Sequence, residues 1–197
     1  MKSIKEDFSL MSSLLIPVAV AINFTGFTIV KMLNVPLFLD SIGTVFISLL
    51  AGPWVGSVAA IITNIVTGGL APENLAFIPV GILIAVVMGT LTRFKMKNYV
   101  VKIVVCTLIL AIVSISSSTL ITILVYGGIT PNATGVLTSF FVNQGMSLKV
   151  AAILANFISE IGDKVITVVI AMLIVKSMSD RYLIKFKYGE NYIHGTK

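Results

Sequence analysis

Six long apolar stretches constrain the fold of this chain more than any other feature of the sequence. They lie near residues 9–30, 41–51, 54–70, 76–92, 99–126 and 148–175. Hydrophobic residues make up 57% of the 197 positions and charged residues only 11%, which is too apolar for a water-soluble domain. A helix crosses a bilayer with roughly 20 such residues. The sequence therefore predicts an all-α integral membrane protein, a bundle of six transmembrane helices.

Basic residues are distributed unevenly between the stretches, and this predicts the orientation of the chain. Eleven of the 14 lysine and arginine residues lie in the N-terminus, the connection 93–102 or the C-terminus. Because cytoplasmic connections are enriched in these residues, both termini are expected in the cytoplasm. The nearly uncharged connections, which are expected outside, lie near 31–40, 67–76 and 127–147. We expect a multi-pass protein of the cell membrane, surrounded by the lipid bilayer.

The domain organisation is simple. Without a linker or a repeat, residues 1–197 are expected to form a single membrane domain that ends in a basic cytoplasmic tail, 177–197. The net charge of +6 comes from residues at membrane ends rather than on one soluble face. No nucleic-acid partner is therefore expected.

Residue types that carry catalysis are scarce. Cys106 is the one cysteine and His194 the one histidine, so neither a disulfide nor a histidine-based metal site is expected. The sequence has no Walker phosphate loop and no G-x-S-x-G elbow. We expect no enzyme activity, no catalytic residue, no metal and no ATP site in this chain.

A polar stripe interrupts the last apolar stretch, in NFISEIGDKVITVVIAMLIVK. Asn156, Glu160, Asp163 and Lys164 share one face of a helix by their spacing. Charges at this depth are costly in lipid and usually functional, and Glu160 with Lys164 has the i, i+4 spacing of an ion pair. The pair is either structural or part of a cavity wall. One lysine leaves one carboxylate unpaired, so Asp163 is expected to face water, another helix or a ligand.

A second set of polar residues suggests the other walls of a cavity. Asp40, Thr44 and Ser48 repeat at i+4, and Asn64 lies in the next apolar stretch. Asp40 either binds a ligand or caps the N-terminus of the helix over 41–51, and its position favours the cap. Asp40, Asn64, Asn156, Glu160 and Asp163 are thus candidate substrate-binding residues.

The connection 127–147 is longer than a compact bundle needs, and long connections are often lids or binding loops. We favour a lid. Its amide side chains offer hydrogen bonds to a neutral polar ligand, and its two aromatic rings either stack on a ligand or anchor in the membrane interface. These further candidate substrate-binding residues are Asn132, Phe140, Phe141, Asn143 and Gln144.

Several motifs together resemble a known family. The stretch VPLFLDSIGTVFISLLAGPWVGSVAAIITNIVTGG over 35–69, then Pro79-Val80-Gly81 and the EIGDK helix, is similar to a substrate-binding S component of an energy-coupling factor (ECF) vitamin transporter. The resemblance implies a six-helix protein that binds a water-soluble vitamin from outside, under its first, third and fifth loops. By overall resemblance cobalamin ranks first, followed by pyridoxine-like compounds and thiamine precursors.

The resemblance also implies partners: a transmembrane coupling subunit and two ATPase subunits, which supply the energy that this chain lacks. The family's contact with the coupling subunit is an Ala-xxx-Ala pair on the first helix. Here Ala19 is followed by Asn23, and Ala21 by Thr25, so Ala21 and Thr25 are the candidate subunit contact. The alternative is a non-transporting six-helix membrane protein, either a sensory input domain or a partner in cell-wall assembly.

Overall fold

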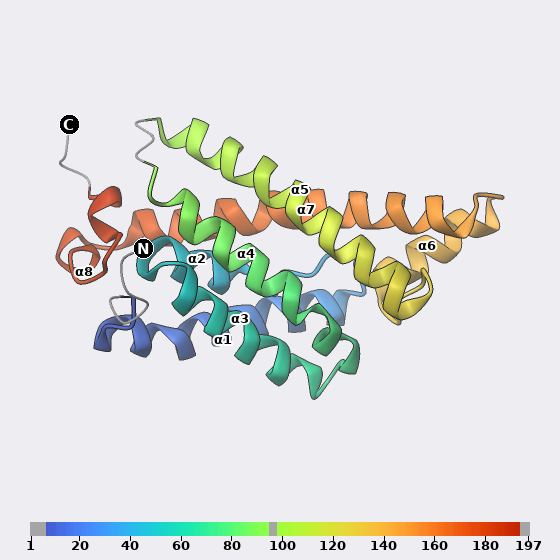
Figure 1. The fold of residues 1–197 in the computed structure, drawn as a ribbon, viewed down its shortest axis with the longest axis horizontal. Coiled ribbons are helices and arrows are strands. Elements are labelled where there is room, and N and C mark those ends of the chain that lie inside the picture. The colour runs from blue at the N-terminus through green and yellow to red at the C-terminus, as the bar shows by residue number, and fades with distance from the viewer. Residues whose placement is uncertain (1–6, 95–97, 194–197) are drawn as a thin grey trace.

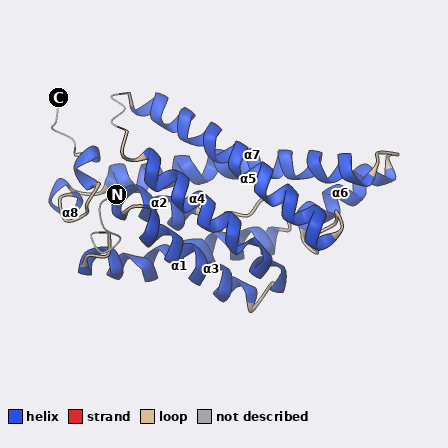
Figure 2. Cartoon of the chain, in the orientation of Figure 1, coloured by secondary structure: helices blue, strands red, loops and turns tan. Residues whose placement is uncertain are grey.

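The computed structural model describes residues 7–94 and 98–193, and this part of the chain is helical without any strand (Figures 1 and 2). The all-α fold class is confirmed. Some residues on which the predicted orientation and the expected absence of a metal site depend lie outside the described part. They are Lys2, Lys5, Lys95, Lys97, His194 and Lys197.

Each predicted apolar stretch corresponds to a helix. In chain order the elements are α1 Leu10–Leu33, α2 Ile42–Ala51, α3 Pro53–Gly68, the 3-10 helix η2 Pro72–Phe77, α4 Ile78–Leu91, α5 Tyr99–Tyr126, α6 Ala133–Asn143, α7 Leu148–Ser177, α8 Asp180–Leu183 and the 3-10 helix η3 Gly189–Tyr192. The predicted boundaries of α5 match the observed ones. Four elements were not predicted, and they are η2, α6, α8 and η3.

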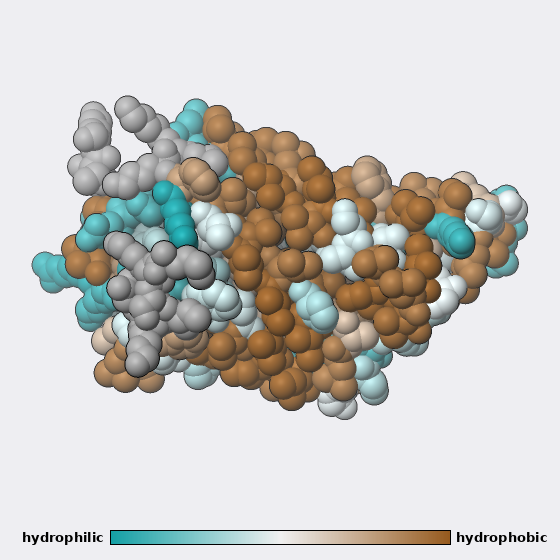
Figure 3. All heavy atoms as spheres, in the orientation of Figure 1, coloured by the Kyte–Doolittle hydropathy of each residue, from teal (hydrophilic) through white to brown (hydrophobic). Residues whose placement is uncertain are grey.

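Three helical segments are long and apolar enough to cross a membrane, namely Leu10–Leu33, Pro72–Leu91 and Tyr99–Tyr126. Helices α2, α3 and α6 are shorter, and the 10 residues of α2 rise only about 15 Å. Apolar surface covers the middle of the face shown in Figure 3, and hydrophilic atoms gather near the two termini. The fold is compatible with a membrane location.

Helix α2 lies at the centre of the packing. All of its residues are buried, and it contacts α1, α3, α4 and α7. Close approach to α1 depends on Gly43, where a Cβ would lie 2.0 Å from the carbonyl oxygen of Ala19. A helix enclosed on all sides in this way holds the residues at its two ends in fixed positions.

Asn23 joins three helices through hydrogen bonds. Its amide group donates to the hydroxyl oxygens of Thr44 on α2 and Thr63 on α3, both at 2.9 Å. Its carbonyl oxygen accepts from the backbone N–H of Gly43 at 2.6 Å. Polar side chains that bond across helices hold membrane bundles together. Asn23, which breaks the Ala-xxx-Ala spacing, therefore fixes the start of α2.

Replacing Asn23 with leucine is expected to lower the free energy of unfolding by roughly 2–4 kcal/mol, because each buried polar group left without a partner costs about 1–3 kcal/mol. Thermal unfolding in detergent micelles measures this loss. The control is Thr25→Val two residues along the same helix, whose exposed hydroxyl donates only to Ala21 of α1 itself. Equal melting temperatures for the two variants would contradict the role given to Asn23.

The basic tail, predicted as a polar cytoplasmic segment, folds against the bundle. Leu183 is fully buried and belongs to the same apolar core as α2 and α4. The backbone N–H of Tyr188 donates to the carbonyl oxygen of Leu50 at 3.0 Å. The hydroxyl groups of Tyr192 and Thr92 lie 2.9 Å apart in a hydrogen bond. As far as residue 193, the tail therefore caps the end of the bundle at which both termini lie (Figure 1).

Two neighbouring residues test this cap. Leu183→Ala is expected to cost about 2–5 kcal/mol of unfolding free energy, as large-to-small changes in a packed core do. Ile184→Ala removes a side chain that is 60% exposed and is expected to change stability by less than about 0.5 kcal/mol. Thermal unfolding of the two variants side by side provides the comparison, and a tail that does not pack would give no difference.

Candidate functional site

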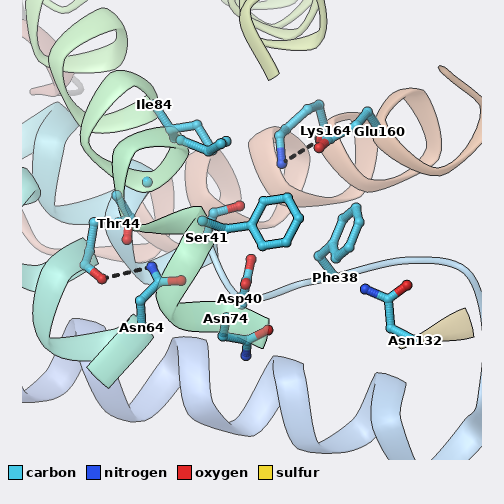
Figure 4. A pocket seen from close by; sticks show the side chains of 14 residues that line it. Phe38, Asp40, Ser41, Thr44, Asn64, Asn74, Ile84, Asn132, Glu160 and Lys164 are labelled. Atoms are coloured by element: carbon cyan, nitrogen blue, oxygen red, sulfur yellow. Dashed lines mark hydrogen bonds and ion pairs between the residues drawn. The ribbon is translucent and has the colours of Figure 1, made fainter. Parts of the chain in front are cut away.

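Two adjoining cavities lie where the connection 34–41 meets α3, η2 and α7 (Figure 4). The deep chamber has a volume of about 40 Å³, and the vestibule beside it has about 270 Å³. They share four lining residues, Phe38, Asp40, Asn74 and Asn132. The polar residues of the deep chamber are Asp40, Ser41, Thr44, Asn64, Asn74, Asn132, Glu160 and Lys164.

Three polar atoms of this chamber are buried and form no hydrogen bond within the described part of the chain. They are Ser41 Oγ, Asn74 Nδ2 and Glu160 Oε2. Buried polar atoms in folded proteins nearly always have hydrogen-bond partners, and exceptions need an explanation. A hydroxyl, an amide donor and a carboxylate oxygen around one chamber are suited to binding a polar molecule.

The predicted ion pair of α7 is present and lies in the wall of the deep chamber (Figure 4). Lys164 Nζ lies 3.1 Å from Glu160 Oε2, in contact but outside hydrogen-bond geometry. The same ammonium group donates to Asp163 Oδ2 at 2.5 Å. All three side chains are buried, Lys164 with only 2% exposure. Lys164 therefore compensates two carboxylates rather than one.

The chain itself supplies the remaining partners of Asp163. Its Oδ1 accepts from the backbone N–H groups of Phe38 at 3.2 Å and Leu39 at 2.6 Å. Leu39 has φ +49°, a left-handed conformation that is uncommon outside glycine. Asp163 lines neither cavity, so the expectation of a ligand-facing carboxylate is not met. Its role is to hold the connection that forms the wall of the site.

Asp40 lies in this connection, between α1 and α2, and lines both cavities. The predicted N-cap is wrong, because Ser41 is the N-cap residue of α2, and the side-chain oxygen that accepts from the first turn is that of Asn23. Burial first, and the negative charge of Asp163 second, raise the pKa of Asp40 to about 6. Among the described residues, its carboxylate has no hydrogen-bond or ion-pair partner on another residue. Asp40 is therefore free to bind a ligand.

The structure brings some of the other predicted residues into the site. Asn64 lines the deep chamber and donates to its own helix, at Ala60 O. Asn132 is the N-cap of α6, where its Oδ1 accepts from Gly135 N at 3.1 Å, and it lines both cavities. Asn156 is buried, donates to Ala152 O and lines neither cavity. Asn64 and Asn132 thus remain candidates, and Asn156 does not.

The connection 127–147 lines the vestibule over residues 131–134 and lies away from both cavities beyond them. It forms helix α6 rather than an irregular lid, and α6 packs against α7 (Figure 1). The rings of Phe140 and Phe141 contact each other edge to face at 5.7 Å between centroids. Together with Asn143 and Gln144, which are exposed, they line neither cavity. Phe140 is 55% exposed, which fits an anchor in the membrane interface better than a ligand contact.

Sequence reasoning missed several residues of the site. Phe38 and Phe77 supply aromatic walls, and Phe77 stacks on Tyr126 with centroids 6.1 Å apart. Ser41 and Asn74 supply the unpartnered atoms described above. One signal pointed to Ser41, its place in the LDSIGT motif, but none pointed to Asn74, which lies in a short 3-10 helix.

The predicted subunit contact on α1, formed by Ala21 and Thr25, lies outside both cavities. Ala21 lines an exposed groove between α1 and α3 whose other lining residues are apolar, among them Pro17, Phe24 and Ile62. Thr25 is exposed one turn further along and donates to Ala21 O at 2.8 Å. The small residues leave this face open for a helix or for lipid.

No protein-family model, curated protein or solved structure matches this chain. The functional argument therefore depends on the geometry of the site and on the motifs quoted above.

The charges of α7 give a sharp test of stability. Lys164→Met is expected to lower the free energy of unfolding by about 3–5 kcal/mol, because it leaves buried carboxylates without their countercharge. Glu160→Gln leaves the contact between Lys164 and Asp163 in place and is expected to cost only about 1–2 kcal/mol. Thermal unfolding in detergent measures both. A Glu160→Gln variant that is as unstable as Lys164→Met would contradict this division of roles.

Proposed function

We propose that this chain is the substrate-specific membrane subunit of an ECF-type transporter, which binds a small water-soluble vitamin or vitamin precursor. The observation that carries the proposal is the presence of two buried polar atoms without a partner, on Ser41 and Asn74, beside the ion pair of Glu160 and Lys164 in the wall of one chamber. Polar atoms at a few fixed points, with aromatic walls between them, are typical of small-molecule sites.

In this proposal six helical segments form the membrane bundle, and both termini face the cytoplasm. The segments are α1, α2, α3, η2 with α4, α5 and α7. The connection 34–41 and η2 then face outside, so the vestibule is the entrance for a ligand. The excess of basic residues at the terminal end supports this orientation.

The size of the site favours the smaller candidates among the vitamins. A vestibule of about 270 Å³ is close to the lower bound of roughly 300 Å³ for small-molecule pockets. A pyridine or pyrimidine compound has dimensions of this order, whereas the corrin ring of cobalamin with its substituents is several times larger. We therefore place pyridoxine-like compounds and thiamine precursors ahead of cobalamin.

The proposal assigns the chemistry of energy coupling to other chains. A transmembrane coupling subunit would contact α1 at the groove that contains Ala21, with Thr25 at its edge, and two ATPase subunits would drive transport. The chain itself then binds its ligand without turnover. The apolar groove supports a contact with another membrane helix, since small residues let two backbones approach closely.

Binding without turnover is the direct test. The purified chain, reconstituted alone in vesicles, is expected to retain a vitamin during gel filtration but not to accumulate it when ATP is supplied. Asn74→Ala is expected to weaken binding about tenfold, because a buried hydrogen bond to the ligand is lost. The matched control is Asn143→Ala, which alters an exposed amide outside both cavities. ATP-driven uptake by the isolated chain, or equal affinities for the two variants, would refute the proposal.

A further inference from the structure

The charges around the cavities do not balance. Three carboxylates, on Asp40, Glu160 and Asp163, surround one ammonium group, on Lys164. Lys164 is already in contact with both Glu160 and Asp163, and these three side chains are buried. Uncompensated charge is costly where water is scarce, because the effective dielectric is low. The site therefore favours a ligand that brings positive charge.

The vestibule does not supply the missing charge. Lys31 and Glu73 line it, and they carry opposite charges. The ammonium group of Lys31 donates to the carbonyl oxygen of Leu70, away from the deep chamber. Within the described part of the chain, no further lysine or arginine lines either cavity.

A second observation locates the place where the charge would bind. Ser41 follows Asp40 directly, is only 4% exposed and has a hydroxyl oxygen without a partner in the wall of the deep chamber. Figure 4 shows Asp40 and Ser41 beside Phe38 and Asn74 at the edge of this chamber. A carboxylate, a hydroxyl acceptor and an aromatic face form a suitable environment for an ammonium or ring-nitrogen cation.

We propose that the ligand is a small organic cation with an aromatic ring, whose positive charge binds at Asp40 and Ser41 and whose ring lies in the vestibule against Phe38. This inference rests on the proposed function and adds the charge class of the ligand. An anionic ligand would add a further negative charge to three carboxylates, and a neutral ligand would leave the imbalance in place. Specificity then comes from repulsion of anions as much as from attraction of the cation.

A set of compounds that share one ring but differ in charge tests the inference. Pyridoxamine carries an ammonium group, pyridoxine a hydroxyl group and 4-pyridoxic acid a carboxylate at the same ring position. Thiamine, a pyrimidine joined to a permanently charged thiazolium ring, is a cation of a different ring type, and the remaining water-soluble vitamins complete the panel. Binding to the purified full chain is measured by calorimetry at pH 7. The expected result is that thiamine or pyridoxamine binds at least tenfold more tightly than pyridoxine, and that 4-pyridoxic acid does not bind.

The variant Asp40→Asn removes the charge and keeps the shape. It is expected to weaken binding of the cation at least tenfold and to reduce the difference in affinity between the cation and pyridoxine. Glu190→Gln is the control, because Glu190 lies in η3, at the terminal end of the bundle. It is expected to leave affinity unchanged.

The outcomes separate the two proposals. Preferred binding of a neutral or anionic vitamin, or an Asp40→Asn variant with unchanged affinity, would overturn the charge class and leave the proposed function standing. Failure of a folded parent chain to bind any vitamin of the panel would overturn the proposed function, and the inference with it.

Discussion

The carboxylate of Asp163 joins the two parts of the molecule that form the site. It accepts hydrogen bonds from the backbone N–H groups of Phe38 and Leu39 on one side and contacts Lys164 on the other. The connection 34–41 contains two residues in the left-handed region, Asn34 and Leu39, and such a backbone keeps its shape only when its surroundings hold it. This anchor on α7, together with Asn23 at the start of α2, holds the segment that carries Asp40 and Ser41 beside the ion pair.

This constraint explains why α7 differs from a simple membrane helix. It is 30 residues long, but because of its charges it is not among the helices that are apolar enough to span a membrane. Glu160, Asp163 and Lys164 avoid the cost of contact with lipid because they face the bundle, with exposures of 2% or less. Exposed apolar side chains such as Phe157, Ile161 and Val165 cover its other face. One helix thus separates a lipid-compatible face from a charged one.

Local patterns in the sequence predicted local structure well. Runs of apolar residues located α5 to the residue, and the i, i+4 spacing predicted the contact between Glu160 and Lys164. Relations between distant segments were not predictable in this way. The partners of Asp163 are 124 and 125 residues away along the chain, and nothing in the spacing of α7 points to them.

Helix α6 and the fold of the tail were not predicted for similar reasons. Helix α6 has only 11 residues, and its sequence ATGVLTSFFVN contains glycine and β-branched residues that weaken local helix signals. The charges of the tail predicted a basic cytoplasmic segment but not its fold. Its few apolar residues, among them Leu183 and Phe186, decide its fold instead by packing into the core of the bundle.

The two ends of α2 show why the site lies where it does. At its C-terminus, the carbonyl oxygens of Leu49 and Leu50 accept hydrogen bonds from Thr92 and Tyr188, so the tail and α4 complete this end. At its N-terminus, Ser41 forms no capping bond and its hydroxyl has no partner. Asn23 accepts from the backbone N–H of Gly43 at this end, so the hydroxyl of Ser41 is the group that still needs a partner, and this favours binding of a polar ligand. The fold therefore satisfies α2 where the chain closes on itself, and the hydroxyl of Ser41 remains available where the cavities lie.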